Sequence, residues 1–357
     1  MSPMRCCTLV TLLLSFCNHA LTFSCKNSAG QNVDWFIVYK LPKTIDVVPD
    51  VPKGKAFLYM DMVTGTWTRS VVPIDAETSP IRLTLTPLQQ LHKKQNDSMA
   101  YVLYNDQPPT NITASNSLGH TKGVVVVGKS SGFWLVHSTP DFPPKAGQPF
   151  VWPHTALHYG QSFLCVSFDF HQFPSIGSQL LCNEPHVYDS AVPPSFLPVL
   201  SSFEQVAKEQ WQCTPIARRN VSLSSRAGQH FVSFAKSRHF DDDLYSGFVA
   251  PTLGVPLYVE SWRNSPHVLN SNCSAQFPVF NVKTVDLLGQ IEFHTTQDHC
   301  KWCVAQSDGG MVAPWVCVGD VNRIAAEMKR GGGTLCLSDP AVWKAFYNAV
   351  NDYEKCD

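Results

Sequence analysis

The sequence predicts a mixed α/β (α+β) protein whose two similar halves form a pseudo-dimer with one shared site between them. Apolar runs of strand length occur throughout both halves, while only a few segments have the periodicity of a helix. A proline-rich passage, AVPPSFLP (191–198), divides the chain near its middle. The same His-x-Lys triplet opens a strand-like run in each half, at 120–122 and at 299–301.

Residues 1–22 have the pattern of a cleaved signal peptide. Arg5 precedes an apolar run of about 11 residues, which is too short to cross a bilayer, and small residues suited to cleavage follow it. No later stretch has the length and hydrophobicity of a membrane span. We therefore expect a secretory-pathway chain without a membrane span, with an N-terminal half at 23–190 and a C-terminal half at 191–357.

The N-terminal half contains five runs rich in β-branched, aromatic and aliphatic residues, which are typical of buried strands. These runs are VDWFIVYKL (33–41), AYVLYND (100–106), GVVVVG (123–128), GFWLVHS (132–138) and FLCVSFDF (163–170). Between them, TPLQQLHKKQ (86–95) is predicted to form a short helix, because Pro87 fits the first helical turn.

The C-terminal half contains four further strand-like runs and ends in a predicted helix, DPAVWKAFYNAVNDYEKC (339–356). The strand-like runs are HFVSFAK (230–236), PLYVESW (256–262), KWCVAQ (301–306) and PWVCVGD (314–320). Asp339 can cap the helix, and Pro340 fits its first turn. The apolar stripe expected along it comprises Val342, Phe346, Val350 and Tyr353.

The cysteines and the glycosylation sequons agree with a secreted route. Loss of the signal peptide removes three of the 13 cysteines, and those that remain are expected to form disulfides in an oxidising compartment. The Asn-x-Ser/Thr sequons are at Asn96, Asn111, Asn220 and Asn272.

The balance of charge depends on pH. The chain has 27 lysines and arginines against 28 aspartates and glutamates, and it carries 13 histidines. Histidine is the side chain whose charge changes between pH 5 and 8, so acid turns a neutral chain into a polycation that suits a polyanionic partner. Composition alone favours the simpler alternative, that the histidines are scattered and have no common role.

The two His-x-Lys triplets are the main candidates for catalysis. Residues i and i+2 of a strand point to the same face, so His120 and Lys122 are expected to project together, as are His299 and Lys301. One such triplet is weak evidence because short triplets recur by chance. Two copies, each opening a similar hairpin in its own half, favour a functional interpretation.

Each triplet is followed by a strand, a glycine-containing turn and a returning strand. The turns are GKSSG (128–132) and SDGG (307–310). The returning strand brings polar side chains back beside the triplet, where they become candidates for orienting the histidines. These candidates are His137 and Ser138 in the first half, and Asp320 and Asn322 in the second.

Two facing histidines and two lysines suit the cleavage of a phosphodiester. A neutral histidine can attack phosphorus and form a phosphohistidine, while a protonated one gives its proton to the leaving oxygen and then helps water attack. The lysines supply positive charge to the phosphate oxygens, so no metal ion or other cofactor is expected. The histidines should titrate as a coupled pair whose pKa values are lowered by the lysines, which favours acid conditions.

At these residues the sequence resembles the deoxyribonuclease II family, acid endonucleases of the phospholipase-D-like superfamily. The resemblance covers nearly all of the chain that follows the signal peptide. The matching segments are VDWFIVYKLP (33–42), YNDQPP (104–109), GHTKG (119–123), GFWLVHSTPDFPP (132–144), YGQSFLCVSF (159–168), FAKSRHFDDDLYSG (234–247), SNCS (271–274), DHCKWCV (298–304), WVCVGDVNR (315–323) and GGGTLC (331–336).

The resemblance implies a metal-independent endonuclease of double-stranded DNA that leaves 3′-phosphate ends. It also implies a pseudo-dimer of two phospholipase-D-like halves and a lysosomal location, with secretion kept open. The passage 180–196 resembles the beta-type branch more than the alpha-type. Whether the chain also forms a homodimer is left open.

The sequence departs from the superfamily motif His-x-Lys-x4-Asp. The aspartate position holds Val127 in the first half and Gln306 in the second, which leaves open what orients each histidine. The Gly-Asp-Val-Asn of 319–322 resembles the superfamily's Gly-Ser-x-Asn element. Superfamily analogy gives His120 a slight preference as the nucleophile.

Three disulfides are implied by the family: Cys25–Cys165, Cys273–Cys356 and Cys317–Cys336. We infer Cys182–Cys213 as a fourth pair. Cys300 and Cys303 are then left over as buried thiols.

Several alternatives compete with the nuclease interpretation. CKWC (300–303) could be a redox motif or part of a zinc site with Cys317 and Cys336, and DDD (241–243) could bind a metal, although a helix N-terminus is its commoner meaning. At the level of function, a lipid phosphodiesterase would use the same chemistry. A non-catalytic glycoprotein that binds DNA in acid is the alternative from a different class.

Overall fold

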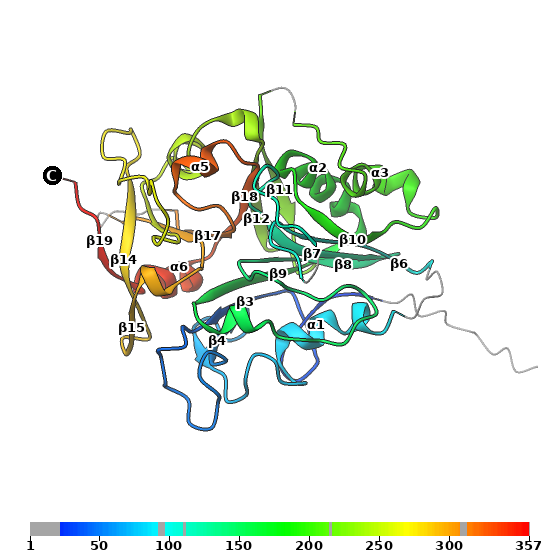
Figure 1. Cartoon of the computed structure of the whole chain (residues 1–357), viewed down its shortest axis with the longest axis horizontal. Helices are drawn as coiled ribbons and strands as arrows, with labels where there is room; N and C mark the ends of the chain where they lie inside the picture. Colours follow the sequence, from blue (N-terminus) through cyan, green and yellow to red (C-terminus); the bar gives the residue numbers. More distant parts are fainter. Residues whose placement is uncertain (1–21, 92–96, 110–111, 214–215, 308–312, 357) are drawn as a thin grey trace, which may run out of the picture.

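The computed structural model describes residues 22–91, 97–109, 112–213, 216–307 and 313–356 (Figure 1). Two large, mainly antiparallel β-sheets, one from each half of the chain, make up most of the structure, and short helices cover their faces. The predicted mixed α+β class is confirmed.

The first sheet has the strand order β10-β6-β7-β8-β9-β3-β4-β5. Its strands are β3 (Trp35–Lys40), β4 (Phe57–Asp61), β5 (Thr68–Arg69), β6 (Met99–Asn105), β7 (Lys122–Gly128), β8 (Ser131–His137), β9 (Gln161–Asp169) and β10 (Val187–Ala191). A separate two-stranded sheet pairs β1 (Cys25–Lys26) with β2 (Asn32–Val33).

The second sheet has the order β11-β12-β18-β17-β16-β13-β14-β15, with β19 paired to β14 off this path. Its strands are β11 (Arg218–Ser224), β12 (His230–Lys236), β13 (Leu257–Glu260), β14 (Val279–Leu287), β15 (Ile291–His294), β16 (Trp302–Ala305), β17 (Trp315–Gly319), β18 (Gly332–Ser338) and β19 (Val350–Tyr353). The nine strand-like runs expected from the sequence all contain strands.

The helices are short. They are α1 (Pro80–Gln89), α2 (Phe173–Asn183), α3 (Leu197–Ala207), α4 (Ala250–Leu253), α5 (Ala325–Met328) and α6 (Pro340–Tyr347), with 3-10 turns at His154–Leu157, Phe170–Gln172, Arg238–Phe240 and Thr295–Gln297 and a π-turn at Tyr245–Val249.

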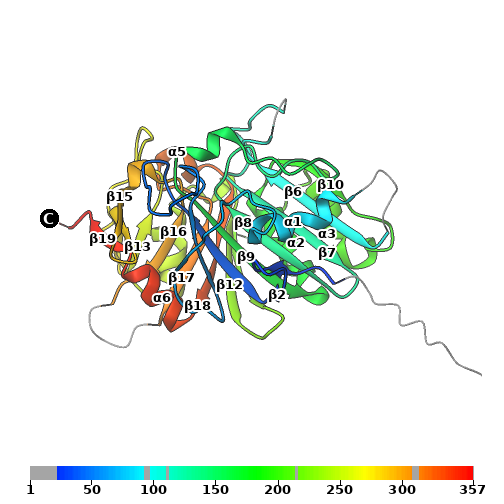
Figure 2. The same cartoon turned by 90° about the horizontal axis from the view of Figure 1, so that it is seen from below.

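Five strands of each sheet share one connectivity. In the first sheet, neighbours follow the order β6-β7-β8-β9-β3, and in the second they follow β13-β16-β17-β18-β12. All neighbours in both sets are antiparallel, and in both the strand that comes first in sequence lies beside the one that comes last. Figure 2 shows the two sets lying next to one another. A pseudo-dimer predicts this correspondence.

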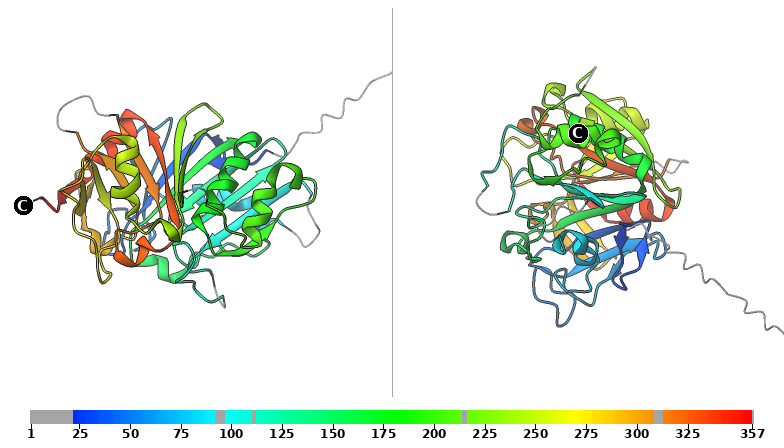
Figure 3. Two further views of the ribbon diagram at one scale, coloured as in Figure 1. Left: turned by 90° about the horizontal axis from the view of Figure 1, so that it is seen from above. Right: turned by 90° about the vertical axis from the view of Figure 1, so that its right-hand side faces the viewer.

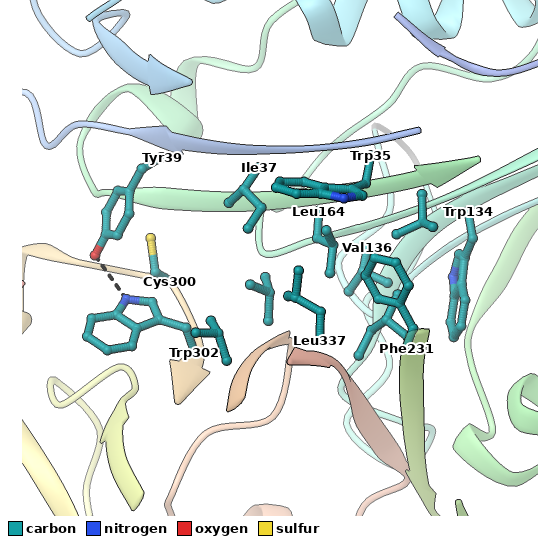
Figure 4. Close-up of a cluster of buried hydrophobic side chains, with 14 of the residues drawn as sticks. Trp35, Ile37, Tyr39, Trp134, Val136, Leu164, Phe231, Cys300, Trp302 and Leu337 are labelled. Carbon is teal, nitrogen blue, oxygen red and sulfur yellow. Dashed lines mark hydrogen bonds between the residues drawn. The ribbon is translucent and has the colours of Figure 1, made fainter. Parts of the chain in front are cut away.

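The two sheets share a central core between them. Alternate residues of β3, namely Trp35, Ile37 and Tyr39, point into it, and Trp302 and Leu337 enter it from the second sheet (Figure 4). The indole Nε1–H of Trp302 donates a hydrogen bond of 3.2 Å to the hydroxyl of Tyr39, which ties the two sheets together.

Each sheet also has a covered outer face. On β7, Val125 and Val127 enter the central core, whereas Val124 and Val126 enter an outer core with helix α1. The second sheet packs its outer face against the helical segment 244–250. The layers can be followed in Figure 3. Burial on both faces explains why the strands are continuous apolar runs rather than alternating ones.

Helix α1 begins six residues earlier than the sequence suggested. Ser79 is its N-cap, since its hydroxyl accepts a 3.1 Å hydrogen bond from the backbone N–H of Arg82, and Pro80 occupies the first turn. Pro87 therefore lies within the helix, near its C-terminal end, and the expectation that it marked the start was wrong. Residues 92–95 of the expected helix lie outside the described residues.

The C-terminal helix is shorter than expected. Asp339 caps α6 as predicted, accepting hydrogen bonds from the backbone N–H groups of Ala341 and Val342, but the helix ends at Tyr347. Residues 350–353 instead form β19, which pairs with β14. Tyr353 packs on Tyr258 with ring centroids 4.7 Å apart. The second half of the expected apolar stripe, Val350 and Tyr353, therefore belongs to a strand and not to the helix.

The structure contains the four expected disulfides, Cys25–Cys165, Cys182–Cys213, Cys273–Cys356 and Cys317–Cys336. Cys300 and Cys303 are buried free thiols. Of the sequons, Asn220 is exposed on edge strand β11 and Asn272 is half-buried, whereas Asn96 and Asn111 lie outside the described residues. Within the described part of the chain, no helix is long and apolar enough to span a membrane.

Candidate active site

His120 lies just before β7 and is held by the C-terminal half of the chain. Its backbone N–H donates a hydrogen bond of 2.9 Å to the carbonyl of Gly331. Its ring Nδ1 donates to the carbonyl of Asp320. The imidazole is buried, and Nε2 is the ring nitrogen left for chemistry.

His299 lies just before β16 and is held by the N-terminal half. Its backbone N–H donates a hydrogen bond of 3.0 Å to the carbonyl of Gly160, and its ring Nδ1 donates one of 2.9 Å to the carbonyl of Ser138. Because a carbonyl can only accept, both histidines carry a hydrogen on Nδ1, so Nε2 bears the lone pair when the ring is neutral.

The two sets of partners occupy equivalent places in the shared strand order. Ser138 follows β8 and Asp320 follows β17, while Gly160 precedes β9 and Gly331 precedes β18. The sequence suggested that the polar residues of each half would orient that half's own histidine. In the structure this arrangement is exchanged, because each imidazole is oriented by a backbone carbonyl from the opposite half.

The surroundings of the two rings differ. Nε2 of His120 lies 3.8 Å from a carboxylate oxygen of Asp106 and 3.6 Å from one of Glu327. His299 faces the indole of Trp262, with ring centroids 5.3 Å apart, and its Nδ1 lies 3.4 Å from the amide oxygen of Gln161. One ring is thus in an acidic environment and the other in an aromatic and amide environment.

Both lysines of the triplets are buried close to the histidines. The ammonium of Lys122 pairs with Asp106, and the ammonium of Lys301 donates a 2.6 Å hydrogen bond to the carbonyl of His299. Burial, followed by the charge of Lys122, lowers the pKa of Lys301 to about 8, so Lys301 is charged in acid. The charge of Lys122 therefore acts on Lys301, although the two lysines come from different halves of the chain.

Arg330 is a third cation at this site. Its guanidinium lies 3.1 Å from a carboxylate oxygen of Asp106 and donates a 2.8 Å hydrogen bond to the carbonyl of Leu118. Burial alone would raise the pKa of Asp106, but the positive charges of His120, Lys122 and Arg330 outweigh it and hold that pKa well below its usual range. Asp106 therefore stays ionised in acid.

The two imidazoles are shifted in the same direction for different reasons. Burial lowers the pKa of His120 to about 4, although Asp106 and Glu327 oppose that shift. Burial also lowers the pKa of His299, and there Lys301, Lys122 and His120 add to the shift. The charge on His120 is one of the causes that lower the pKa of His299.

The remaining predicted site residues have separate roles. His137 accepts a 3.2 Å hydrogen bond from the backbone N–H of Thr139 and packs between aromatic rings, without a hydrogen bond to the imidazole of His120 or of His299. Asn322 donates a 2.6 Å hydrogen bond from its amide to Glu327 and accepts one of 3.1 Å from the backbone N–H of Trp262. Asn322 thus links the acidic and the aromatic sides of the site.

The carboxyl group of Asp320 lies beneath the lysine of the opposite half. It accepts a 3.1 Å hydrogen bond from the backbone N–H of Lys122. Burial raises the pKa of Asp320 to about 8, so this carboxyl is neutral in acid and adds no negative charge to the site.

Sequence reasoning missed five contributors: Asp106, Gln161, Trp262, Glu327 and Arg330. Asp106 could have been found, because it is the last residue of the strand-like run 100–106. Glu327 and Arg330 sit in a polar stretch, IAAEMKRGGG (324–333), which has the composition of an ordinary surface turn. They reach the site because the segment between β17 and β18 lies beside His120 and Asp106.

The metal and redox alternatives gain no support. Cys317 and Cys336, the further ligands that a zinc site would need, are joined in a disulfide. Asp243 accepts a 3.0 Å hydrogen bond from the backbone N–H of Ser246 at the start of a helical segment and pairs with Arg323. Among the described residues, no three His, Cys, Asp or Glu side chains are grouped so that they could hold a metal ion.

The chain is similar to known proteins along nearly its whole length. The family model "Deoxyribonuclease II" matches residues 24–356. Deoxyribonuclease-2-alpha of Mus musculus is 44% identical over 342 residues, which cover 94% of each chain. Plancitoxin-1 of Acanthaster planci is 40% identical over 93% of this chain and 92% of its own. Deoxyribonuclease-2-beta of Homo sapiens is 36% identical over 94% and 92%.

The family model and these relatives define the class of protein, which is a nuclease. The chain belongs to the deoxyribonuclease II family and is a nuclease of that type. The resemblance of 180–196 to the beta-type branch gains no support from the identities, since the murine alpha-type relative is more similar than the human beta-type one.

Proposed function

We propose that this protein is a metal-independent acid endonuclease that hydrolyses double-stranded DNA through a phosphohistidine and leaves 3′-phosphate and 5′-hydroxyl ends. The observation that carries the proposal is that a backbone carbonyl of each half orients the imidazole of the other half through Nδ1, so these hydrogen bonds leave Nε2 of both rings available for chemistry. Lys122 and Lys301 supply the positive charge that a phosphodiester needs there.

The carboxylates beside His120 favour its protonated form, so we assign the general acid to His120 and the nucleophile to His299. Nε2 of His299 attacks phosphorus, the P–O5′ bond breaks, and the leaving oxygen takes a proton from His120. Water then attacks phosphorus while His120 removes a proton from it, and the P–N bond breaks. This assignment reverses the slight preference for His120 as nucleophile that superfamily analogy gave.

The shared connectivity of the two sheets supports a pseudo-dimer within one chain, because both histidines come from equivalent positions. A homodimer has no support among the described residues, and the proposal does not require one. Four disulfides suit an oxidising compartment, and the acid working range suits a lysosomal nuclease reached through the secretory pathway. Secretion from the cell is compatible with the same features.

The deciding experiment is plasmid cleavage at pH 5 in excess EDTA, compared with pH 7.5. We expect cleavage at pH 5 that EDTA leaves intact, with 3′-phosphate ends shown by end-labelling. Activity that disappears in EDTA and returns with Mg²⁺ would overturn the metal-independent mechanism. A protein that binds DNA in acid without cutting it would be the non-catalytic alternative, and cleavage of phospholipid but not DNA would be the lipid alternative.

A further inference from the structure

Two buried lysines outside the His-x-Lys triplets occupy matching positions in the two halves. Lys40 is the last residue of β3, and Lys236 is the last residue of β12, the equivalent strand in the shared order. Both side chains are fully buried. Lys40 lies opposite Gln161 at the start of β9, and Lys236 lies opposite Gly332 at the start of β18.

The ammonium of Lys236 is bonded entirely to the backbone of one loop. It donates hydrogen bonds of 2.8, 3.0 and 2.5 Å to the carbonyls of Glu327, Met328 and Arg330, which uses all three of its N–H groups. The next residue, Gly331, accepts the backbone hydrogen bond of His120. The loop also carries the side chains of Glu327 and Arg330, which face the site.

The ammonium of Lys40 does the same in the other half. It donates hydrogen bonds of 2.9 and 2.5 Å to the carbonyls of Leu157 and Tyr159. The next residue, Gly160, accepts the backbone hydrogen bond of His299. The ring of Tyr159 packs against Trp262, with centroids 4.5 Å apart, and Trp262 in turn faces His299.

Neither ammonium group has a carboxylate within salt-bridge distance among the described residues, so the carbonyls are the partners that stabilise the charge. Burial lowers the pKa of Lys40 to about 7 and that of Lys236 to about 8, so both are charged at pH 5. More distant groups that oppose these shifts are Cys300 and Asp298 around Lys40, and Glu327, Asp243, Glu184 and Asp242 around Lys236. An apolar side chain would fill either place without the cost of burying a charge.

We propose that Lys40 and Lys236 are positioning residues, each fixing the loop whose glycine carbonyl holds the backbone of the catalytic histidine from the opposite half. Lys236 acts through Gly331 on His120, and Lys40 acts through Gly160 on His299. The consequence for catalysis rests on the proposed roles of the two histidines, whereas the fixing of the loops does not.

The kinetic test compares Lys40→Met and Lys236→Met with Lys208→Met, whose exposed lysine directly follows α3 and pairs with Glu204. At pH 5 we expect kcat on plasmid DNA to fall about 10- to 100-fold in the first two variants, because a displacement of about 1 Å at a catalytic group has an effect of that size. KM should change by less than about threefold, since the lysines do not touch DNA. Lys208→Met should match the parent protein.

Amide hydrogen exchange separates positioning from general stability. Lys236→Met should speed exchange at His120 and leave His299 protected, and Lys40→Met should do the reverse. Exchange that rises equally at both amides, or at neither, would overturn the proposal. Amide exchange can be measured even if the wild-type protein has no nuclease activity. Failure of the proposed function and failure of this inference are therefore distinguishable.

A second pair of variants covers the case in which a methionine variant does not fold. Lys40→Arg and Lys236→Arg keep the charge and the N–H donors, so they should recover part of the kcat and of the selective amide protection. Lys40→Gln and Lys236→Gln keep two donors without the charge and should show the selective loss in a milder form. If the arginine and glutamine variants behave like the parent in both exchange and kcat, the positioning role is wrong.

Discussion

Glu327 places a carboxylate oxygen 3.6 Å from Nε2 of His120. Among the described residues, His299 has no carboxylate within salt-bridge distance, and its neighbours there are Trp262 and Gln161. The two histidines come from equivalent positions in the two halves, but their surroundings differ. That inequality supports the proposed division of the roles of acid and nucleophile between them.

The division predicts different responses to the leaving group. Thymidine 3′-(4-nitrophenyl phosphate) releases nitrophenolate, which needs no proton, in place of the 5′-oxygen of DNA. His120→Ala should lose about 10²- to 10⁴-fold on DNA, the usual range for general acid catalysis, but release a burst of nitrophenolate with little loss. His299→Ala should give no burst. A burst from His299→Ala alone would assign the nucleophile to His120.

Substitution of Glu327 should shift the pH dependence. The charge of Glu327 raises the pKa of His120 against the effect of burial, so Glu327→Gln lowers that pKa and leaves less of the acid form at pH 5. We expect kcat to fall at pH 5 and to recover at lower pH, which a kcat profile from pH 3 to 7 will measure. Glu292→Gln, at an exposed position on β15, is the matched control. An unshifted profile would show that Glu327 does not tune the acid.

The double variant His120→Ala, His299→Ala should be little worse than either single variant. Both residues act on one reaction coordinate, so their effects are far from additive. Rates on supercoiled plasmid, with circular dichroism to confirm folding, test this. If the two losses multiplied instead, the rings would belong to independent sites, and the shared site would be refuted.

DNA affinity should rise in acid independently of the chemistry. Among the described residues, seven histidines are exposed: His154, His158, His171, His230, His239, His267 and His294. Histidine gains charge between pH 7.5 and 5, whereas lysine and arginine do not change, so added phosphate contacts should steepen the salt dependence of binding. Fluorescence anisotropy with His299→Ala protein across a salt series at both pH values measures the effect. Parallel salt slopes and equal affinities would refute it.

Much of the fold could be predicted from local pattern, because central strands such as β3, β7 and β8 are buried on both faces. Val124 to Val127 are all fully buried, and such a run has few alternatives to a strand. The helices were harder, since their ends depend on tertiary contacts. The sequence predicted that the last helix continues to residue 356, but residues 350–353 pair with β14 instead. No local signal in the sequence reveals this pairing.

The triplets could be predicted because histidine and lysine two apart have a direct geometric meaning. The partners of the histidines could not be, because they are main-chain carbonyls contributed by the other half. Every residue has a backbone carbonyl, so residue type gives no sign of this role. Ser138 and Asp320 were suggested for their side chains, whereas their backbone carbonyls orient the rings. Predicting that Asp106, Glu327 and Arg330 lie at the site would have required the register between the strands.

The exchange of partners between the halves bears on when the enzyme becomes able to cut. Gly331, which holds the backbone of His120, comes much later in the sequence than His120 itself. A growing chain therefore carries the whole of the first His-x-Lys triplet before the residue that holds its histidine has been added.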